Sequence, residues 1–141
     1  MKKYSRLQKL AWFYSFLFFG VVAMNAIPFI HDENGLMFGL FKLDPIDDGL
    51  HLASALWALS AGLYSRGATI FYFKWYGLAY CLDGVMGLLI GKGYLDLGVF
   101  FQEVAVSGWL TRLEVNIPHL ILGGSAALLG FYFSRTKMFR A

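Results

Sequence analysis

Residues 68–90 read ATIFYFKWYGLAYCLDGVMGLLI, an apolar run of 23 residues interrupted by only two charged side chains. About 20 mostly apolar residues are the length that crosses the hydrocarbon core of a membrane as a helix. Gly77, Gly84 and Gly91 recur every seven residues along this stretch. Small residues at such spacing let helix backbones approach closely in a membrane. The stretch therefore predicts a transmembrane helix that packs against other helices.

Three further apolar runs surround this one, at residues 10–30, 48–64 and 117–133. Hydrophobic residues make up 58% of the chain and charged residues only 15%, whereas a soluble domain carries about 25% charged residues. A water-soluble fold of this size could not hide so much apolar surface. The sequence predicts an all-α fold in a single domain, residues 1–141, in which four transmembrane helices form a bundle.

The two halves of the chain, about residues 10–66 and 68–135, resemble each other. Asp48-x-x-His51 and Asn116-x-x-His119 each open a helix rich in small residues, which ends in a Ser-Arg pair. Both of these helices enter from the same side of the membrane. The pattern predicts two helix pairs related by a parallel internal repeat, with a pseudo-twofold axis along the membrane normal.

Charge predicts the orientation of the bundle. Nine of the twelve basic residues fall at one set of span ends: Lys2, Lys3, Arg6, Lys9, Arg66, Lys74, Arg135, Lys137 and Arg140. Eight of the nine acidic residues fall at the opposite ends: Asp32, Glu33, Asp44, Asp47, Asp48, Asp96, Glu103 and Glu114. Because cytoplasmic loops carry the excess of Lys and Arg, we expect a multi-pass protein of the cell membrane with both termini in the cytoplasm.

The two longer connections are expected to lie on the acidic side of the membrane. Segment 98–113 mixes aromatic and aliphatic residues with a few polar ones, which is typical of a short amphipathic helix in the headgroup layer. Segment 35–43 is expected to be its shorter counterpart. Such a helix acts either as an interfacial anchor, the simpler interpretation, or as a cap over the mouth of the bundle.

Asp83 is the residue that departs most from what lipid tolerates. It lies 8 residues inside the predicted end of its span, or about 12 Å deep at a rise of about 1.5 Å per residue. Because desolvation penalises the charged form, an acid at this depth usually faces the bundle interior, paired or protonated. Tyr80, Asn25 and Ser54 are the candidate partners at similar depth. These four residues predict either a structural hydrogen-bond cluster or a polar ligand, ion or proton site.

His51 and His119 occupy equivalent positions in the two halves, and two interpretations of them stay open. Because Asp48 and Asn116 are favoured N-cap residues, each histidine can complete the start of a helix, and no cofactor is then expected. Alternatively, two imidazoles at equal depth, with Asp48, could bind a divalent metal such as zinc or hold a haem axially. His31, beside two acids, is expected to be a solvated interfacial residue.

The stretch from 39 to 52, GLFKLDPIDDGLHL, resembles bacterial four-span membrane proteins catalogued as domain of unknown function 4383. In that family a Gly-Leu-Phe turn leads through Asn or Asp to a His-Leu helix start, and a second His-Leu start opens the last span. The matching positions here are Gly39 to Phe41, Asp44, His51 and His119. Asp47-Asp48 depart from the family pattern, which has histidine or asparagine there, and this weakens a metal role. The resemblance covers about residues 35–135. It implies a four-span fold and a location in the membrane, but no particular reaction.

The favoured function is therefore that of a non-enzymatic membrane protein that binds lipid, a membrane partner or a second copy of itself, as a subunit of a larger assembly. The chain has no GxSxG elbow and no phosphate-binding loop. Its basic residues form short clusters at span ends, so nucleic acid is not an expected partner. The alternative function is a ligand-, metal- or haem-binding protein or membrane enzyme that uses His51, His119 and Asp83.

Overall fold

The computed structural model describes residues 4–101, 106 and 108–136. Across these residues the chain is helical, with no β-strand, and the predicted all-α class is confirmed. The elements in order are α1 (Arg6–Asn25), η1 (Pro28–Ile30), α2 (Pro45–Tyr64), α3 (Arg66–Ile90), α4 (Gly98–Phe101) and α5 (Trp109–Arg135).

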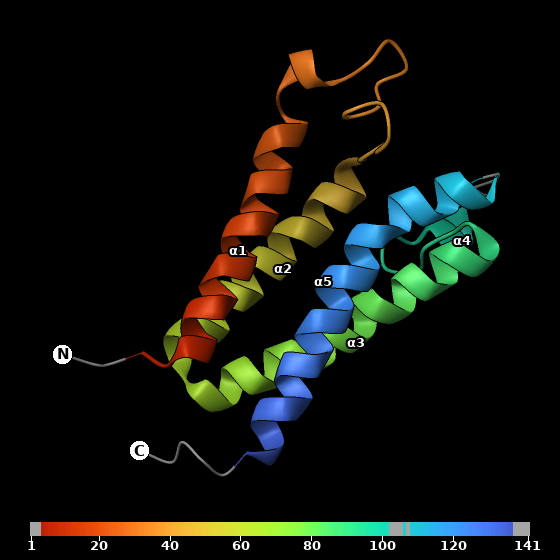
Figure 1. Ribbon diagram of the computed structural model, residues 1–141. Helices are drawn as coiled ribbons and strands as arrows, with labels where there is room; N and C mark the ends of the chain where they lie inside the picture. The colour runs from red at the N-terminus through yellow and green to blue at the C-terminus, as the bar shows by residue number, and fades with distance from the viewer. Residues whose placement is uncertain (1–3, 102–105, 107, 137–141) are drawn as a thin grey trace.

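The long helices form two antiparallel pairs, α1 with α2 and α3 with α5 (Figure 1). A single residue, Ser65, joins α2 to α3, and its side chain accepts a hydrogen bond from the backbone of Ala68 at 3.1 Å. The start of α1, the Ser65 turn and the end of α5 lie together, at the bottom of Figure 1. We call this the basic end, because Arg6, Lys9, Arg66 and Arg135 lie there, and the opposite end the acidic end.

Glycines bring the backbones of α3 and α5 into contact. A methyl group at Gly77 would overlap the backbone of Ala127, and one at Gly123 would overlap the backbone of Cys81. At the acidic end, a methyl group at Gly84 would lie 3.0 Å from Cβ of His119. All three glycines are buried. The small-residue faces that the sequence predicts on these two helices are therefore the faces that pack together.

Aromatic rings join the two helix pairs. Tyr14 and Phe18 of α1 contact rings of α3, with centroid distances of 5.2 Å from Tyr14 to Phe73 and 5.4 Å from Phe18 to Tyr76. The Tyr14 hydroxyl also lies 2.7 Å from the Ser125 hydroxyl of α5. The two pairs are therefore joined through aromatic side chains, whereas α3 and α5 contact each other through their backbones.

Two helices begin earlier than the sequence pattern predicts. The N-cap of α2 is Asp44, which forms a capping box with Asp47, and Pro45 occupies the first helical position. The start of α5 is Trp109, so Pro118 lies inside this helix of 27 residues. Asp48 and Asn116 are therefore helical residues, and the prediction that they are N-caps is wrong.

The connections at the acidic end also differ from expectation. Segment 35–43 contains no helix: Gly35, Phe38 and Gly39 have φ values of 74°, 54° and 69°, which no right-handed helix accommodates. Met37 instead forms bridges with His31 and Phe41. Among the described residues of segment 98–113, where a short interfacial helix was expected, helix is found at α4 and in the first turns of α5; residues 102–105 and 107 lie outside the described residues.

Two of the helices, α1 and α5, are long and apolar enough to cross a membrane, judged by length and composition. A core helix of a soluble protein or an N-terminal signal sequence can meet the same criterion. Helix α3 carries Lys74, Asp83 and several tyrosines, which lower its hydropathy despite its 25 residues. The fold thus has two candidate spans by this criterion among the described residues.

Replacing Gly77 by alanine is expected to destabilise the protein by about 1–3 kcal/mol or more, because the added methyl group meets backbone, which cannot rotate away. Gly20→Ala is the matched control, since a methyl group there meets nothing within 4 Å. Thermal unfolding of the two purified variants compares them. Equal unfolding temperatures would contradict the close approach of α3 and α5.

Candidate functional site

Asp83 is the centre of a buried hydrogen-bond cluster at the acidic end of α3. Its side chain is only 2% exposed. Oδ1 accepts hydrogen bonds from the backbone N–H groups of Tyr94 and Leu95, at 2.7 and 2.9 Å. Oδ2 lies 2.7 Å from Nδ1 of His119, on α5. The carboxyl group therefore ties α3, α5 and the loop between α3 and α4 to one point.

Glycines allow this loop to fold back over Asp83. Gly91 ends α3 in the left-handed conformation, with φ of 75°. A methyl group at Gly93 would lie 3.0 Å from Oδ1 of Asp83, so the backbone approaches the carboxylate closely there. The Tyr94 hydroxyl then donates to the carbonyl of Ala79 at 2.7 Å. The loop is fastened to α3 at both Asp83 and Ala79.

The donors to Asp83 are not Tyr80, Asn25 or Ser54, the partners predicted from depth in the membrane. Ser54 of α2 instead bonds the hydroxyl of Tyr80, at 3.1 Å in the buried interior. Asn25 lies in a separate cluster near the end of α1. Sequence reasoning selected the right acid but missed its partners, because two of the three are backbone groups. The Gly91-x-Gly93 pair was the one local signal of a chain reversal near Asp83.

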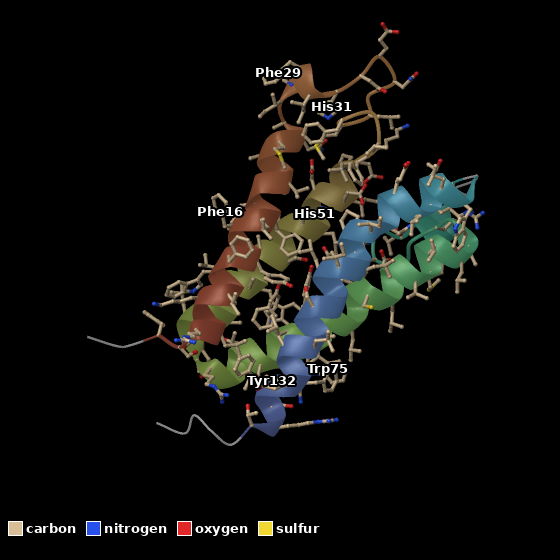
Figure 2. All side chains as sticks on the ribbon, in the orientation of Figure 1. Phe16, Phe29, His31, His51, Trp75 and Tyr132 are labelled. Carbon is tan, nitrogen blue, oxygen red and sulfur yellow. The ribbon has the colours of Figure 1, made fainter. Side chains whose placement is uncertain are left out.

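Neither histidine caps a helix, so the capping interpretation is wrong for both. His51 lies in the second turn of α2, where its Nδ1–H donates to the carbonyl of Asp47 at 2.7 Å. Its ring is 8% exposed and points into the bundle (Figure 2). His119 lies well inside α5, and Asp83 accepts its Nδ1–H. Both imidazoles thus have a proton on Nδ1 and keep Nε2 for another partner.

Two aromatic rings lie between the histidines. Ring centroids are 5.9 Å apart for His51 and Phe18, 5.7 Å for Phe18 and Tyr80, and 5.2 Å for Tyr80 and His119. Asp48, the third predicted ligand, bonds Asn25 instead. Among the described residues, no group of three His, Cys, Asp or Glu side chains is arranged to hold a metal ion.

Asn25 and Asp48 belong to a second polar cluster, which fastens the α1–α2 connection to α2. Asn25 Nδ2 donates to Asp48 Oδ2 at 2.9 Å, and its Oδ1 lies 3.1 Å from Nε2 of His31. Nδ1 of His31 lies 3.0 Å from the carbonyl of Ile27, which only accepts. Both ring nitrogens of His31 thus face oxygen atoms, those of Asn25 and Ile27. His31 is therefore a structural residue, not merely a solvated one.

A row of tyrosines on α3 extends from the Asp83 cluster toward the basic end. Tyr72, Tyr76 and Tyr80 follow one face of α3, with ring centroids 4.9 and 4.3 Å apart. Within the described part of the chain, the buried hydroxyls of Tyr72 and Tyr76 have no hydrogen-bond partner. The sequence analysis did not select these two residues, although their spacing of four matches that of Tyr80.

Among the described acidic residues outside the predicted spans, Asp47 has the most strongly shifted pKa. Burial raises its pKa to about 6, and the carboxylates of Asp44 and Asp96 act in the same direction. The backbone N–H of Asp44, which donates to Oδ2 at 2.9 Å, and the charge of His119 oppose this rise in pKa. The carboxyl group is therefore held in an environment that disfavours its ionised form.

No protein-family model, curated protein or solved structure matches this chain. Asp83 orients His119 as a carboxylate orients the imidazole of a general base. The ring of Tyr80 contacts that of His119, but the Tyr80 hydroxyl bonds the hydroxyl of Ser54. With three donors on Asp83, the arrangement is that of an anchor for a loop.

Replacing Asp83 by asparagine is expected to cost about 1–3 kcal/mol of stability, because a charge-assisted acceptor for buried donors is lost. Asp32→Asn is the matched control: Asp32 also accepts two backbone N–H groups, each at 2.8 Å, but in an exposed turn. Amide hydrogen exchange at Tyr94 and Leu95 should accelerate only in the Asp83 variant. Unchanged exchange there would contradict the anchoring role.

Stability should also depend on the protonation of Asp47. Its pKa in the fold, about 6, exceeds the unfolded value of about 4, so its contribution is present below about pH 4 and lost as pH rises through about 6. The wild-type unfolding temperature should therefore fall between about pH 5 and pH 7 by more than that of Asp47→Asn. Identical pH profiles for the two proteins would refute this assignment.

Proposed function

We propose that the chain is an integral membrane protein in which α1, α2, α3 and α5 cross the bilayer, and that it acts without catalysis by binding lipid or a membrane partner. The observation that carries the proposal is the exposure of large apolar side chains on all four long helices. Phe16 and Leu128 are each 73% exposed, and Phe71 is 56% exposed. Patches of this kind on a soluble monomer are rare, whereas lipid covers them without cost.

The interior supports four spans rather than two. Several polar side chains of α2 and α3 face inward and are bonded: Thr69 donates to the carbonyl of Ala61 at 3.1 Å, and Ser54 bonds Tyr80. The buried Asp83 has three donors. In lipid such groups must be satisfied internally. The predicted span of α2, residues 48–64, is about 26 Å long at about 1.5 Å per residue, which is close to the hydrocarbon thickness of about 30 Å.

The separation of charge supports the orientation. Arg6, Lys9, Arg66 and Arg135 lie at the basic end. By the positive-inside rule this end is cytoplasmic, and the acidic end, with Asp32, Glu33 and Glu114, faces outward. The internal repeat and the resemblance to the four-span family 4383 are parts of the same proposal. Each half of the chain supplies one antiparallel helix pair.

The absence of catalysis is proposed because the side chains that could do chemistry serve the fold. Asp83 holds the loop after α3, and His119 is its partner. His51 donates to its own helix and packs against Phe18. The interior between these groups is filled by aromatic rings. The large apolar outer surface is not covered by these contacts, so binding within the membrane is the function that this geometry supports best.

Membrane topology tests the proposal. In a Cys81→Ala background, a cysteine at Glu33 should react with an impermeant maleimide added to intact cells, and a cysteine at Arg66 should react only after lysis. Both proteins should stay in the membrane fraction during alkaline extraction. Release by alkali would refute membrane insertion, and labelling of Arg66→Cys from outside would refute the orientation.

A further inference from the structure

A groove runs along the junction of α3 and α5 at the basic end, with a volume of about 310 Å³. Its walls are apolar and come from both helices: Ile70, Phe71, Trp75 and Leu78 of α3, and Phe131 of α5. Trp75 lies beside the lower half of α5 (Figure 2). Lys74 is the single charged side chain in the lining.

Glycine opens the space for Lys74. A methyl group at Gly130 would collide with the backbone and with Cγ of Lys74, so the lysine stem lies against the bare α5 backbone. The ammonium group then reaches a position 5.1 Å from the centroid of the Phe131 ring, a cation–π contact. No carboxylate of the described residues forms an ion pair with Lys74. The groove therefore presents a cation whose charge no acid neutralises.

The dimensions of the groove match one acyl chain. Its lining begins at Gly67 and ends at Leu78, which is about 16 Å along a helix at about 1.5 Å per residue. This is about half of the hydrocarbon thickness of about 30 Å, so the groove spans one leaflet. Side chains of a helix lean toward its N-terminus, and for α3 this is the basic end. Lys74 therefore leans toward the membrane surface on that side.

Two more cations lie where the groove meets that surface. Arg66 donates to the carbonyl of Phe133 at 3.3 Å, which fixes its guanidinium beside α5. Arg135 occupies the last turn of α5. Together with Lys74 they supply positive charge to the mouth of an apolar slot. A headgroup that carries negative charge complements the three cations, and an acyl chain complements the slot.

We propose that this groove binds an anionic phospholipid of the cytoplasmic leaflet, with its phosphate near Lys74 and Arg66 and one acyl chain along Ile70, Trp75 and Leu78. This inference rests on the membrane insertion proposed above and adds the class of lipid and its site. A soluble anion would leave the apolar walls uncovered. A neutral lipid would leave the lysine charge uncompensated.

A second groove of the protein serves as an internal comparison. It has a volume of about 490 Å³ and lies between α2 and α3. Trp57, Ser60, Tyr64 and Phe71 line it, and none of its lining residues is charged. This neutral groove is expected to accept acyl chains with no preference for the headgroup, so selectivity for anionic lipid is expected only at the groove that contains Lys74.

Native mass spectrometry of the purified protein tests the site, with equal amounts of phosphatidylglycerol and phosphatidylcholine of the same acyl chains. Wild type should retain phosphatidylglycerol in preference, and Lys74→Gln should reduce that preference about five-fold, the equivalent of about 1 kcal/mol per cation. Lys74→Arg should keep it. Lys9→Gln, which removes a charge at the same end but outside the groove, should also keep it.

Several results would overturn the inference. Equal losses in Lys74→Gln and Lys9→Gln would mean that general surface charge attracts the lipid. Equal binding of glycerol phosphate, which has no acyl chains, would mean an anion site without a lipid. Insertion is scored separately, by alkaline extraction from vesicles of phosphatidylcholine alone. A protein that inserts there but prefers no lipid refutes the site and leaves the proposed function standing, whereas failure to insert refutes both.

Discussion

Gly77 of α3 and Gly123 of α5 let the two backbones touch, and this contact sets the register of every other group on the pair. Toward the acidic end, the same register brings His119 against Gly84 and within hydrogen-bond distance of Asp83. Toward the basic end, it lays Lys74 across Gly130 and over Phe131. In lipid, where no hydrophobic drive joins helices, close packing of this kind supplies the attraction.

Asp83 is a buried acid whose hydrogen bonds hold the loop after α3 and helix α5 in place. A buried carboxylate is unfavourable unless hydrogen bonds surround it, and here it receives three donors from two parts of the chain, the loop after α3 and helix α5. The loop after α3 folds inward because the carboxylate of Asp83 accepts the backbone N–H groups of Tyr94 and Leu95. The acid thereby specifies one arrangement of the loop, the one in which Tyr94 and Leu95 face the carboxylate.

The two helix pairs are joined by different means. Within the α3–α5 pair the backbones touch, whereas α1 meets α3 through the rings of Tyr14, Phe18 and Phe73. Aromatic contacts are individually modest and leave the tyrosine hydroxyls of α3 to find partners in the interior. Tyr80 finds Ser54, while Tyr72 and Tyr76 stay unpartnered among the described residues.

Periodicity and composition were sufficient to predict the helical class, the small-residue faces and the burial of Asp83, because these follow from interactions within one helix or with the surrounding solvent. Helix starts were harder: Asp44 and Pro45 form a better cap than Asp48, and α5 continues through Pro118. The partners of Asp83 were out of reach, since His119 is 36 residues away and Tyr94 and Leu95 act through backbone N–H groups that carry no side-chain signal. Such pairings depend on how α3 and α5 interlock, and that register is a property of packing among distant residues.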